Sequence, residues 1–160
     1  FGQDWGGLIG LRLVATDPER FAGLVVSNTG LPDGSGKPND AFMAWQRFSQ
    51  TAEEFPIGRI ITGGCLSKLP PDVIDAYDAP FPDKRYQAGA RAFPQLVPTS
   101  PDNPAIPANR AAWEVLGRWD KPFLALFGSK DPILGRADAG GGAQARPADD
   151  EDRPRRFWGL

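Results

Sequence analysis

Gly2-Gln-Asp-Trp-Gly-Gly7, followed directly by the run Leu8–Ala15, is the stretch that decides the fold. The run is apolar nearly all round, as in a helix that is buried on more than one side. It stops before Asp17-Pro18, because a residue that precedes proline avoids the helical conformation. The short β-rich run Gly23–Asn28 then has the pattern of a parallel strand covered on both faces. The end of a strand, a glycine turn, a helix and a strand in this order predict an α/β fold.

A helical segment interrupts the α/β pattern. Residues 31–37 are rich in Gly, Pro, Ser and Asp, which predicts a loop at the boundary. Helices are predicted at Asp40–Ala52, Asp72–Tyr77, Lys84–Phe93 with Asp83 as N-cap, and Ala108–Leu116 with Gly117 as the C′ residue. We expect the intervening prolines to keep these helices short: Pro80, Pro82, Pro94, Pro98 and Pro101. A second buried strand, Pro122–Gly128, returns to the α/β pattern, so the helices form an insertion between two strands of one sheet.

The four parts of the chain have the following predicted bounds. Residues 1–33 form the first part of the catalytic core, 34–118 a helical cap, and 119–135 the second part of the core. Residues 136–160 lose both the helical and the strand period and are dominated by Ala, Gly, Arg, Pro and Asp. That composition predicts a divergent, disordered tail.

The spacing Gly2-x-Asp4-x-Gly6 is that of a nucleophile elbow, with aspartate in place of the usual serine. Glycines are expected there because the turn from strand to helix is cramped. The backbone N–H of Trp5, at the start of the helix, would supply one donor of an oxyanion hole. The alternative is that Asp4 only caps the helix while Gly6 and Gly7 form a turn.

An aspartate nucleophile implies a reaction in two steps. A carboxylate is ionised at neutral pH and can displace a halide from carbon or open an epoxide, and either attack leaves an ester. Hydrolysis of that ester needs a base to activate water, and histidine is the usual choice. The chain contains no histidine, so we expect the second step to lack its base.

Three further residues are candidates for the site. Asp131 follows the predicted strand, where open α/β sheets place functional groups, and an acid there would orient a histidine; the alternative is an ordinary loop aspartate before proline. The indole N–H of Trp5 can donate to a leaving anion, and Trp45 is the natural second donor if the cap closes over the elbow. Packing of Trp45 with Phe42 and Phe48, at three-residue spacing, is the alternative for that residue.

Composition limits the ligand and the compartment. A net charge of −2 without any block of Lys or Arg argues against nucleic acid or an anionic membrane as partner and favours a small neutral or apolar ligand. Cys65 is the only cysteine, which excludes an internal disulfide and a cysteine-based metal site; we expect a buried thiol in a reducing compartment. No apolar run approaches the roughly 20 residues of a membrane span. The predicted location is the cytoplasm.

The chain resembles the haloalkane dehalogenases of the α/β-hydrolase superfamily from Phe1 to about Leu134. The resemblance rests on these segments: Gln3-Asp-Trp-Gly-Gly7, Phe42-Met-Ala-Trp45, Asp78-Ala-Pro-Phe-Pro-Asp83, Tyr86-Gln-Ala-Gly-Ala-Arg-Ala-Phe-Pro94 and Gly128-Ser-Lys-Asp131. It implies a partial α/β-hydrolase core with an inserted helical cap, and cleavage of carbon–halogen bonds by water without a metal or organic cofactor. It also implies that Asp4 is the nucleophile, that Trp5 and Trp45 bind the halide, and that Asp131 is the acid.

The resemblance has departures, and they leave two alternatives open. Compared with the family, the chain begins at the elbow, so we expect a fragment that lacks the upstream strands and the second oxyanion-hole donor. The parent protein is expected to be a monomer that binds a small halogenated substrate and halide. An epoxide hydrolase shares the Asp-Trp elbow and would use cap tyrosines, here Tyr77 and Tyr86. A non-catalytic, truncated product is the other alternative.

Overall fold

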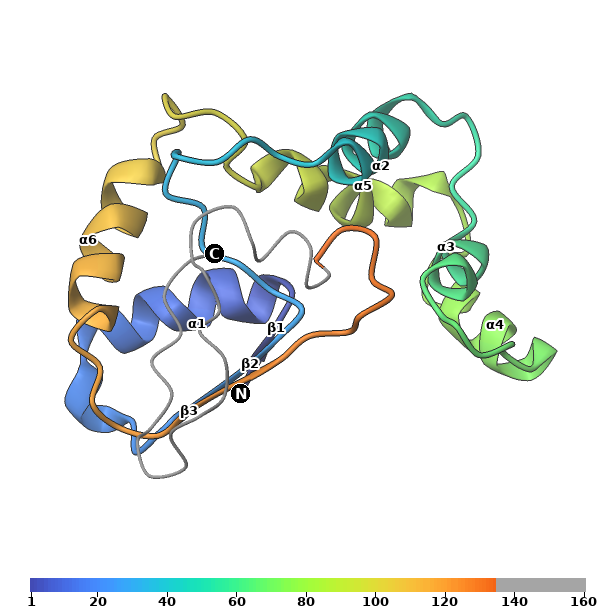
Figure 1. Ribbon diagram of the computed structural model, residues 1–160. Helices are drawn as coiled ribbons and strands as arrows, with labels where there is room; N and C mark the ends of the chain where they lie inside the picture. The colour runs from blue at the N-terminus through green and yellow to red at the C-terminus, as the bar shows by residue number, and fades with distance from the viewer. Residues whose placement is uncertain (135–160) are drawn as a thin grey trace. The chain divides into compact units, whose positions relative to one another are not determined.

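The computed structural model describes residues 1–134, and Figure 1 shows their path. The helices and strands are, in chain order, β1 (Gly2–Gln3), α1 (Trp5–Thr16), the short 3₁₀ helix η1 (Pro18–Arg20), β2 (Leu24–Ser27), α2 (Asp40–Thr51), α3 (Ile57–Gly63), α4 (Pro71–Asp78), the 3₁₀ helix η2 (Lys84–Gln87), α5 (Ala88–Leu96), α6 (Ile106–Leu116) and β3 (Phe123–Leu126). The tail predicted at 136–160 lies outside the described residues.

The described chain divides into two compact units. The core unit consists of Phe1–Asn39 and residues 98–134, and the helical unit of Asp40–Val97. The core unit holds β1, β2, β3, α1 and α6, whereas α2 to α5 belong to the helical unit.

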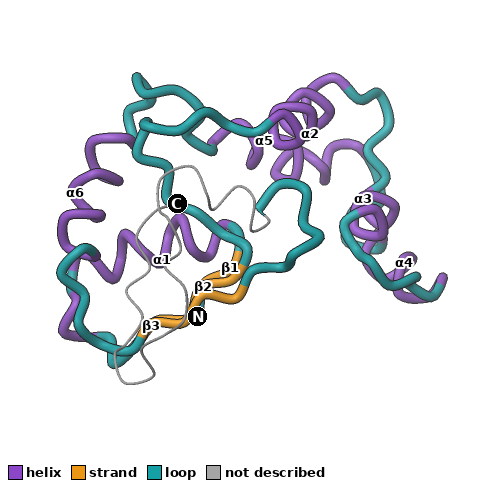
Figure 2. The backbone as a smooth tube through the Cα atoms, viewed as in Figure 1, coloured by secondary structure: helices purple, strands orange, loops and turns teal. Residues whose placement is uncertain are grey.

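The three described strands of the core unit form one parallel sheet in the order β1-β2-β3 (Figure 2). Gly2 pairs with Val26, and Leu24 pairs with Phe123, so β2 lies in the middle. Helix α1 connects β1 to β2, which is the crossover that parallel neighbours require. The predicted α/β fold with a parallel sheet is therefore confirmed.

One face of this sheet carries the core. Leu11 of α1, Val26 of β2, Leu31 and Ala112 of α6 form a buried cluster, and each is at most 5% exposed. Their removal from water supplies the main stabilising term for the unit. The predicted end of α1 is also confirmed, because the helix stops at Thr16, just before Asp17-Pro18.

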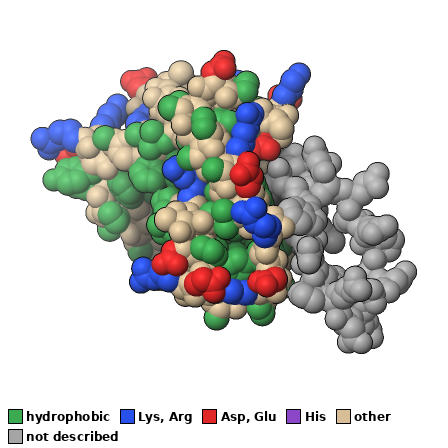
Figure 3. All heavy atoms as spheres, turned by 90° about the vertical axis from the view of Figure 1, so that its left-hand side faces the viewer, with side chains coloured by type: hydrophobic (Ala, Val, Ile, Leu, Met, Phe, Trp, Pro, Cys, Tyr) green, Lys and Arg blue, Asp and Glu red, His purple; other side chains and the backbone are tan. Residues whose placement is uncertain are grey.

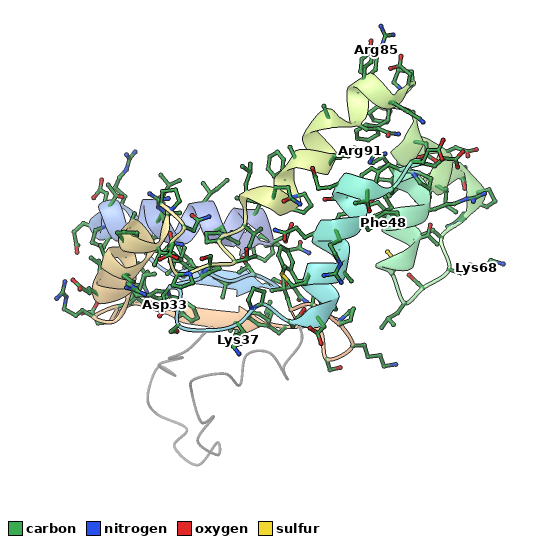
Figure 4. The ribbon with its side chains drawn as sticks, turned by 90° about the horizontal axis from the view of Figure 1, so that it is seen from above. Asp33, Lys37, Phe48, Lys68, Arg85 and Arg91 are labelled. Carbon is green, nitrogen blue, oxygen red and sulfur yellow. The ribbon has the colours of Figure 1, made fainter. Side chains whose placement is uncertain are left out.

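Helix α6 packs on α1 in the core unit, whereas the predicted boundary at 118 put it in the cap. Side chains of α6 donate hydrogen bonds to three successive carbonyl groups after β2: Trp113 to Leu31 at 2.8 Å, Asn109 to Pro32 at 2.7 Å, and Arg110 to Asp33 at 2.7 Å. Figure 4 shows Asp33 beside this helix. These bonds attach α6 to the loop that leaves the sheet, a long-range arrangement that local sequence patterns do not reveal.

The expectation that α1 and the strands are covered on both sides is wrong for the described residues. Ile9 and Leu13 of α1 are 54% and 59% exposed, and Leu124 and Leu126 of β3 are 50% and 49% exposed. Figure 3 likewise shows hydrophobic side chains at the surface among charged ones. The described core unit has a single sheet with its helices packed on one face, so only that face is buried.

In the helical unit, Arg91 of α5 holds the end of α2. Its guanidinium donates to the carbonyl groups of Ser49 and Ala52, at 3.2 and 2.8 Å, and lies 4.5 Å from the ring centre of Phe55. Figure 4 shows Arg91 and Phe48 on these neighbouring helices. The last carbonyls of a helix have no partner within it, so the arginine satisfies two that would otherwise need water.

The predicted helices occur, with corrections at their ends. Asp83 is confirmed as a cap, because its side chain accepts the backbone N–H of Arg85 at 2.9 Å. Pro94 lies inside α5, which continues to Leu96, so the predicted end of this helix at Phe93 is wrong. Gly117 ends α6 with a φ of −60°, in the right-handed region, so it does not adopt the left-handed conformation typical of a C′ glycine.

Helix α3 was missed by sequence reasoning. It is rich in isoleucine and glycine, which are weak helix formers, and is only 7 residues long. Its first turn is stabilised by tertiary structure instead, because the Asp78 carboxylate accepts the backbone N–H of Gly58 at 2.7 Å. The same compactness leaves no room for a side chain at Gly58, where a Cβ would lie 2.6 Å from the Ile74 carbonyl oxygen.

Three observations bear on the predicted ligand classes. Within residues 1–134 no helix is long and apolar enough to cross a membrane. Over the same range no group of three or more His, Cys, Asp or Glu side chains could hold a metal ion. Cys65 is exposed, so the expectation of a buried thiol is wrong; it follows α3 in a surface loop.

Candidate active site

Asp4 is the single residue between β1 and α1, and it lies at the sharp turn that the elbow spacing predicts. Its backbone has φ 48° and ψ −122°, and only one other non-glycine residue in the described chain, Asn28, has a positive φ. For a residue with a side chain this conformation costs about 1–3 kcal/mol, and such strain is concentrated at functional sites. Although Asp4 occupies the N-cap position, its carboxylate makes no capping hydrogen bond, and the side chain is exposed. The geometry therefore favours a presented carboxylate over a simple helix cap.

Two residues that follow β2 hold the Asp4 backbone on both sides. The Asp4 N–H donates to the carbonyl of Asn28 at 3.0 Å, and the Asp4 carbonyl accepts the hydroxyl of Thr29. The same carbonyl accepts the N–H of Gly7 at 3.0 Å, in the first turn of α1. Thr29 is fully buried. The strained residue is thus fixed by its neighbours in the sheet.

The glycines of the elbow have different roles from those expected. A Cβ at Gly2 would lie 2.8 Å from the Gly6 carbonyl oxygen, so strand and helix approach too closely for any side chain. At Gly6 itself a Cβ would meet nothing within 4 Å. Gly7 is the tight position, because its Cβ would lie 1.9 Å from the Thr29 hydroxyl oxygen. The expectation of crowding is confirmed at Gly2 and wrong at Gly6.

Asp131 lies in the loop after β3, where three hydrogen bonds fix its carboxylate. Its Oδ2 accepts Nδ2 of Asn28 at 2.5 Å, and its Oδ1 accepts the backbone N–H groups of Ile133 and Leu134 at 2.8 and 2.9 Å. Partial burial raises the pKa of Asp131, but the bonds from Leu134, Ile133 and Asn28 outweigh it and hold the pKa below its ordinary value of 3.8. The carboxylate is therefore stabilised in its charged form.

Asn28 connects the two predicted acidic residues. Its backbone carbonyl binds the N–H of Asp4, and its side chain binds Asp131 and, through Oδ1, the N–H of Gly128 at 3.1 Å. Sequence reasoning missed Asn28 and Thr29. Their position in the sequence could have indicated their role. They directly follow β2, which lies between β1 and β3, and the carboxyl ends of parallel strands meet at one edge of a sheet.

The two predicted tryptophans occupy different units. Trp5 is the first residue of α1, beside Asp4, and is half-buried. Trp45 lies on α2 of the helical unit, where its ring stacks on Phe48 and Phe55 with centroid distances of 6.0 and 5.8 Å. Packing on these two rings therefore accounts for part of the Trp45 environment.

The hydrogen bonds to Asp131 predict a measurable effect of pH. Because the pKa of this carboxyl is lowered on folding, its contribution to stability is complete above the unfolded value of 3.8 and is lost as the pH falls through the folded value. We expect Asp131→Asn to lower the free energy of unfolding at pH 7 by about 1 kcal/mol, the net value of a hydrogen bond. The difference should shrink below pH 4. Urea unfolding at pH 7, 5, 4 and 3 tests this, and curves that stay equally far apart at every pH would contradict it.

No family model matches the chain. Individual relatives do: a protein named haloalkane dehalogenase 1 from Mycobacterium tuberculosis is 59% identical over 138 residues, which cover 86% of this chain. A haloalkane dehalogenase from Psychrobacter cryohalolentis is 53% identical over the same number of residues. The chain is a homologue of haloalkane dehalogenases. It spans just under half the length of these relatives, 46% in both cases.

The fold of this chain is also similar to solved structures of haloalkane dehalogenases. The structure of haloalkane dehalogenase DpaA from Paraglaciecola agarilytica is described as tetrameric. It matches 85% of the present chain with a TM-score of 0.76 and 34% sequence identity. Haloalkane dehalogenase DbeA from Bradyrhizobium elkani matches 79% with a TM-score of 0.63 and 26% identity. The matches cover 46% and 48% of those two chains. The predicted class, a partial α/β-hydrolase fold, is therefore confirmed.

Proposed function

We propose that Asp4 is the nucleophile of a haloalkane dehalogenase reaction. The observation that carries the proposal is the strained backbone of Asp4, with φ 48°, at a strand-to-helix turn in a chain 59% identical to a haloalkane dehalogenase. The exposed carboxylate, which does not cap α1, supports a role in binding or chemistry. The proposed substrate is a small apolar haloalkane.

The first step is a displacement at saturated carbon. One Asp4 carboxylate oxygen forms a bond to the carbon that bears the halogen, the carbon–halogen bond breaks, and the halide leaves with the bonding electrons. The product is an ester of Asp4. Attack by the carboxylate needs no proton transfer, so this step requires no base.

The halide needs hydrogen-bond donors as it gains charge. We assign this role to the indole N–H groups of Trp5, in the core unit, and of Trp45, in the helical unit. The backbone N–H of Trp5, at the N-terminus of α1, is the proposed oxyanion-hole donor for the later hydrolysis of the ester.

Hydrolysis of the Asp4 ester is the step for which this chain lacks a base. Asp131 is proposed as the acid that would orient a histidine, yet the 160 residues contain none. We therefore expect the 160-residue chain to be alkylated once and to retain the alkyl group. Water attack on the ester then proceeds without general-base assistance, which is worth about a hundredfold to ten-thousandfold in rate.

Incubation with 1-bromobutane followed by intact-mass spectrometry tests the proposal. We expect a mass increase of one butyl group in place of one proton, with one bromide released for each chain. Peptide mapping should place the butyl group on Asp4. The experiment uses the Cys65→Ser variant, because Cys65 is exposed and a surface thiolate also reacts with bromoalkanes.

The possible results separate the alternatives. Absence of an adduct would contradict the proposed function. Bromide release over many cycles would contradict the expectation of a single event. Diol formation from 1,2-epoxybutane, without reaction of 1-bromobutane, would instead favour the epoxide hydrolase alternative.

A further inference from the structure

The Asp4 backbone cannot keep its conformation by local preference alone. A positive φ of 48° with ψ −122° is a region that residues with a Cβ rarely adopt. Such a conformation persists only when the surrounding structure over-determines it. The residues that fix this backbone therefore also fix the direction of the Cα–Cβ bond from which the Asp4 carboxylate extends.

Thr29 makes the side-chain contact that does this. Its hydroxyl donates to the Asp4 carbonyl, and the residue is 0% exposed, so water does not compete for that bond. The Thr29 side chain also lies against Gly7, where an added Cβ would be 1.9 Å from the Thr29 hydroxyl oxygen and 2.3 Å from its γ-methyl carbon. The threonine thus fills the space between the end of β2 and the first turn of α1.

The sheet register explains why Thr29 reaches the elbow. Gln3 of β1 pairs with Ser27 of β2, and both strands run in the same direction. The residues that follow each strand are consequently neighbours, and Thr29 lies next to Asp4 although 25 residues separate them in sequence. A threonine suits the place because it offers a donor for the carbonyl and a methyl group for the packing.

We propose that Thr29 is a positioning residue for the nucleophile: its hydroxyl holds the Asp4 carbonyl, and thereby orients the carboxylate for attack on the haloalkane carbon. The proposal rests on the function proposed above. Thr29 itself touches neither the substrate nor the halide. Its loss should therefore slow the attack without weakening the binding of the haloalkane.

The test measures the rate of alkylation by 1-bromobutane in the Cys65→Ser chain as the bromoalkane concentration rises. Thr29→Val keeps the volume and the methyl group and removes the hydroxyl. We expect its maximal alkylation rate to fall about tenfold to a hundredfold, the effect of a nucleophile displaced by roughly 1 Å. The concentration at half-maximal rate should change by less than about twofold, since uniform binding is unaffected. Thr16→Val is the matched control, because the Thr16 hydroxyl binds only its own helix and is exposed; its rate should not change.

A second pair of variants keeps the test independent of folding. Thr29→Ala and Thr29→Ser both lose the methyl group, but only the serine keeps the hydroxyl, so we expect the serine variant to alkylate faster by about tenfold. Equal rates in this pair, or a folded Thr29→Val chain that alkylates at the parent rate, would overturn the role of Thr29 while leaving the proposed function intact. A parent chain that forms no adduct would contradict the proposed function and, with it, the role of Thr29.

Discussion

Asp4→Asn is expected to abolish the alkylation of the chain by 1-bromobutane. The amide has nearly the same shape as the carboxylate but no negative charge, so it is a poor nucleophile at saturated carbon. Removal of a nucleophile lowers rates by a thousandfold or more in other hydrolases, and we expect a loss of at least about that size. Intact mass after a fixed incubation, in the Cys65→Ser background, measures the fraction alkylated.

Folding should not change in this variant. The hydrogen bonds that hold Asp4 involve its backbone N–H and carbonyl, which the substitution keeps, and its side chain makes no capping bond to α1. Asp131→Asn is the matched control, because it is the same chemical change at the other acid. The Asp131 variant should still gain one alkyl group, since the first step needs no base. An Asp4→Asn chain that is alkylated as fast as its parent would contradict the assignment of Asp4.

Gly7→Ala is expected to destabilise the core unit by about 3 kcal/mol, the upper range for overpacking a buried site. The new Cβ would lie 1.9 Å from the Thr29 hydroxyl oxygen and 2.5 Å from the Thr29 Cβ, so α1 and the residues after β2 would have to move apart. That movement would also break the hydrogen bond from Thr29 to the Asp4 carbonyl, which is worth about 1 kcal/mol.

The neighbouring glycine provides the control. Gly6 lies in the same first turn of α1, but a Cβ there meets nothing within 4 Å. Alanine favours a helix over glycine by up to about 1 kcal/mol, so Gly6→Ala should be neutral or slightly stabilising. Urea unfolding of the two variants and the parent measures the difference. Equal destabilisation by the two substitutions would show that the close contact with Thr29 is not responsible.

The elbow illustrates how far local sequence patterns reach. The spacing of Gly2, Asp4 and Gly6 predicts a strand-to-helix turn, and the turn is present with a strained Asp4. The pattern was right about crowding at Gly2 and wrong at Gly6. It gave no sign of the crowding at Gly7, which comes from Thr29 at the end of another strand. A motif specifies local backbone geometry, whereas steric limits depend on what packs against it.

The same distinction applies to Asp131 and the helices. The position of Asp131 after a strand predicted its place at the edge of the sheet, but not that Asn28 would bind both its carboxylate and the backbone of Asp4. Helices with amphipathic spacing were predicted, whereas α3, which depends on Asp78 for its first turn, was not. Propensity is a local quantity, and an element that is stabilised by a distant side chain has a weak local signal.

By itself, the sequence determined the order of the strands and of every α-helix except α3, the parallel α/β class, the aspartate at the elbow and the absence of histidine, because periodicity, glycine spacing and composition are local properties of the chain. Only the tertiary structure decided which residues hold Asp4, which face of the sheet is buried, and that α6 belongs with α1. These depend on the register of parallel strands and on contacts between residues up to 103 positions apart, such as Asn28 with Asp131. Such contacts form only when the chain folds, because the local sequence of one segment does not indicate which distant segment will pack against it.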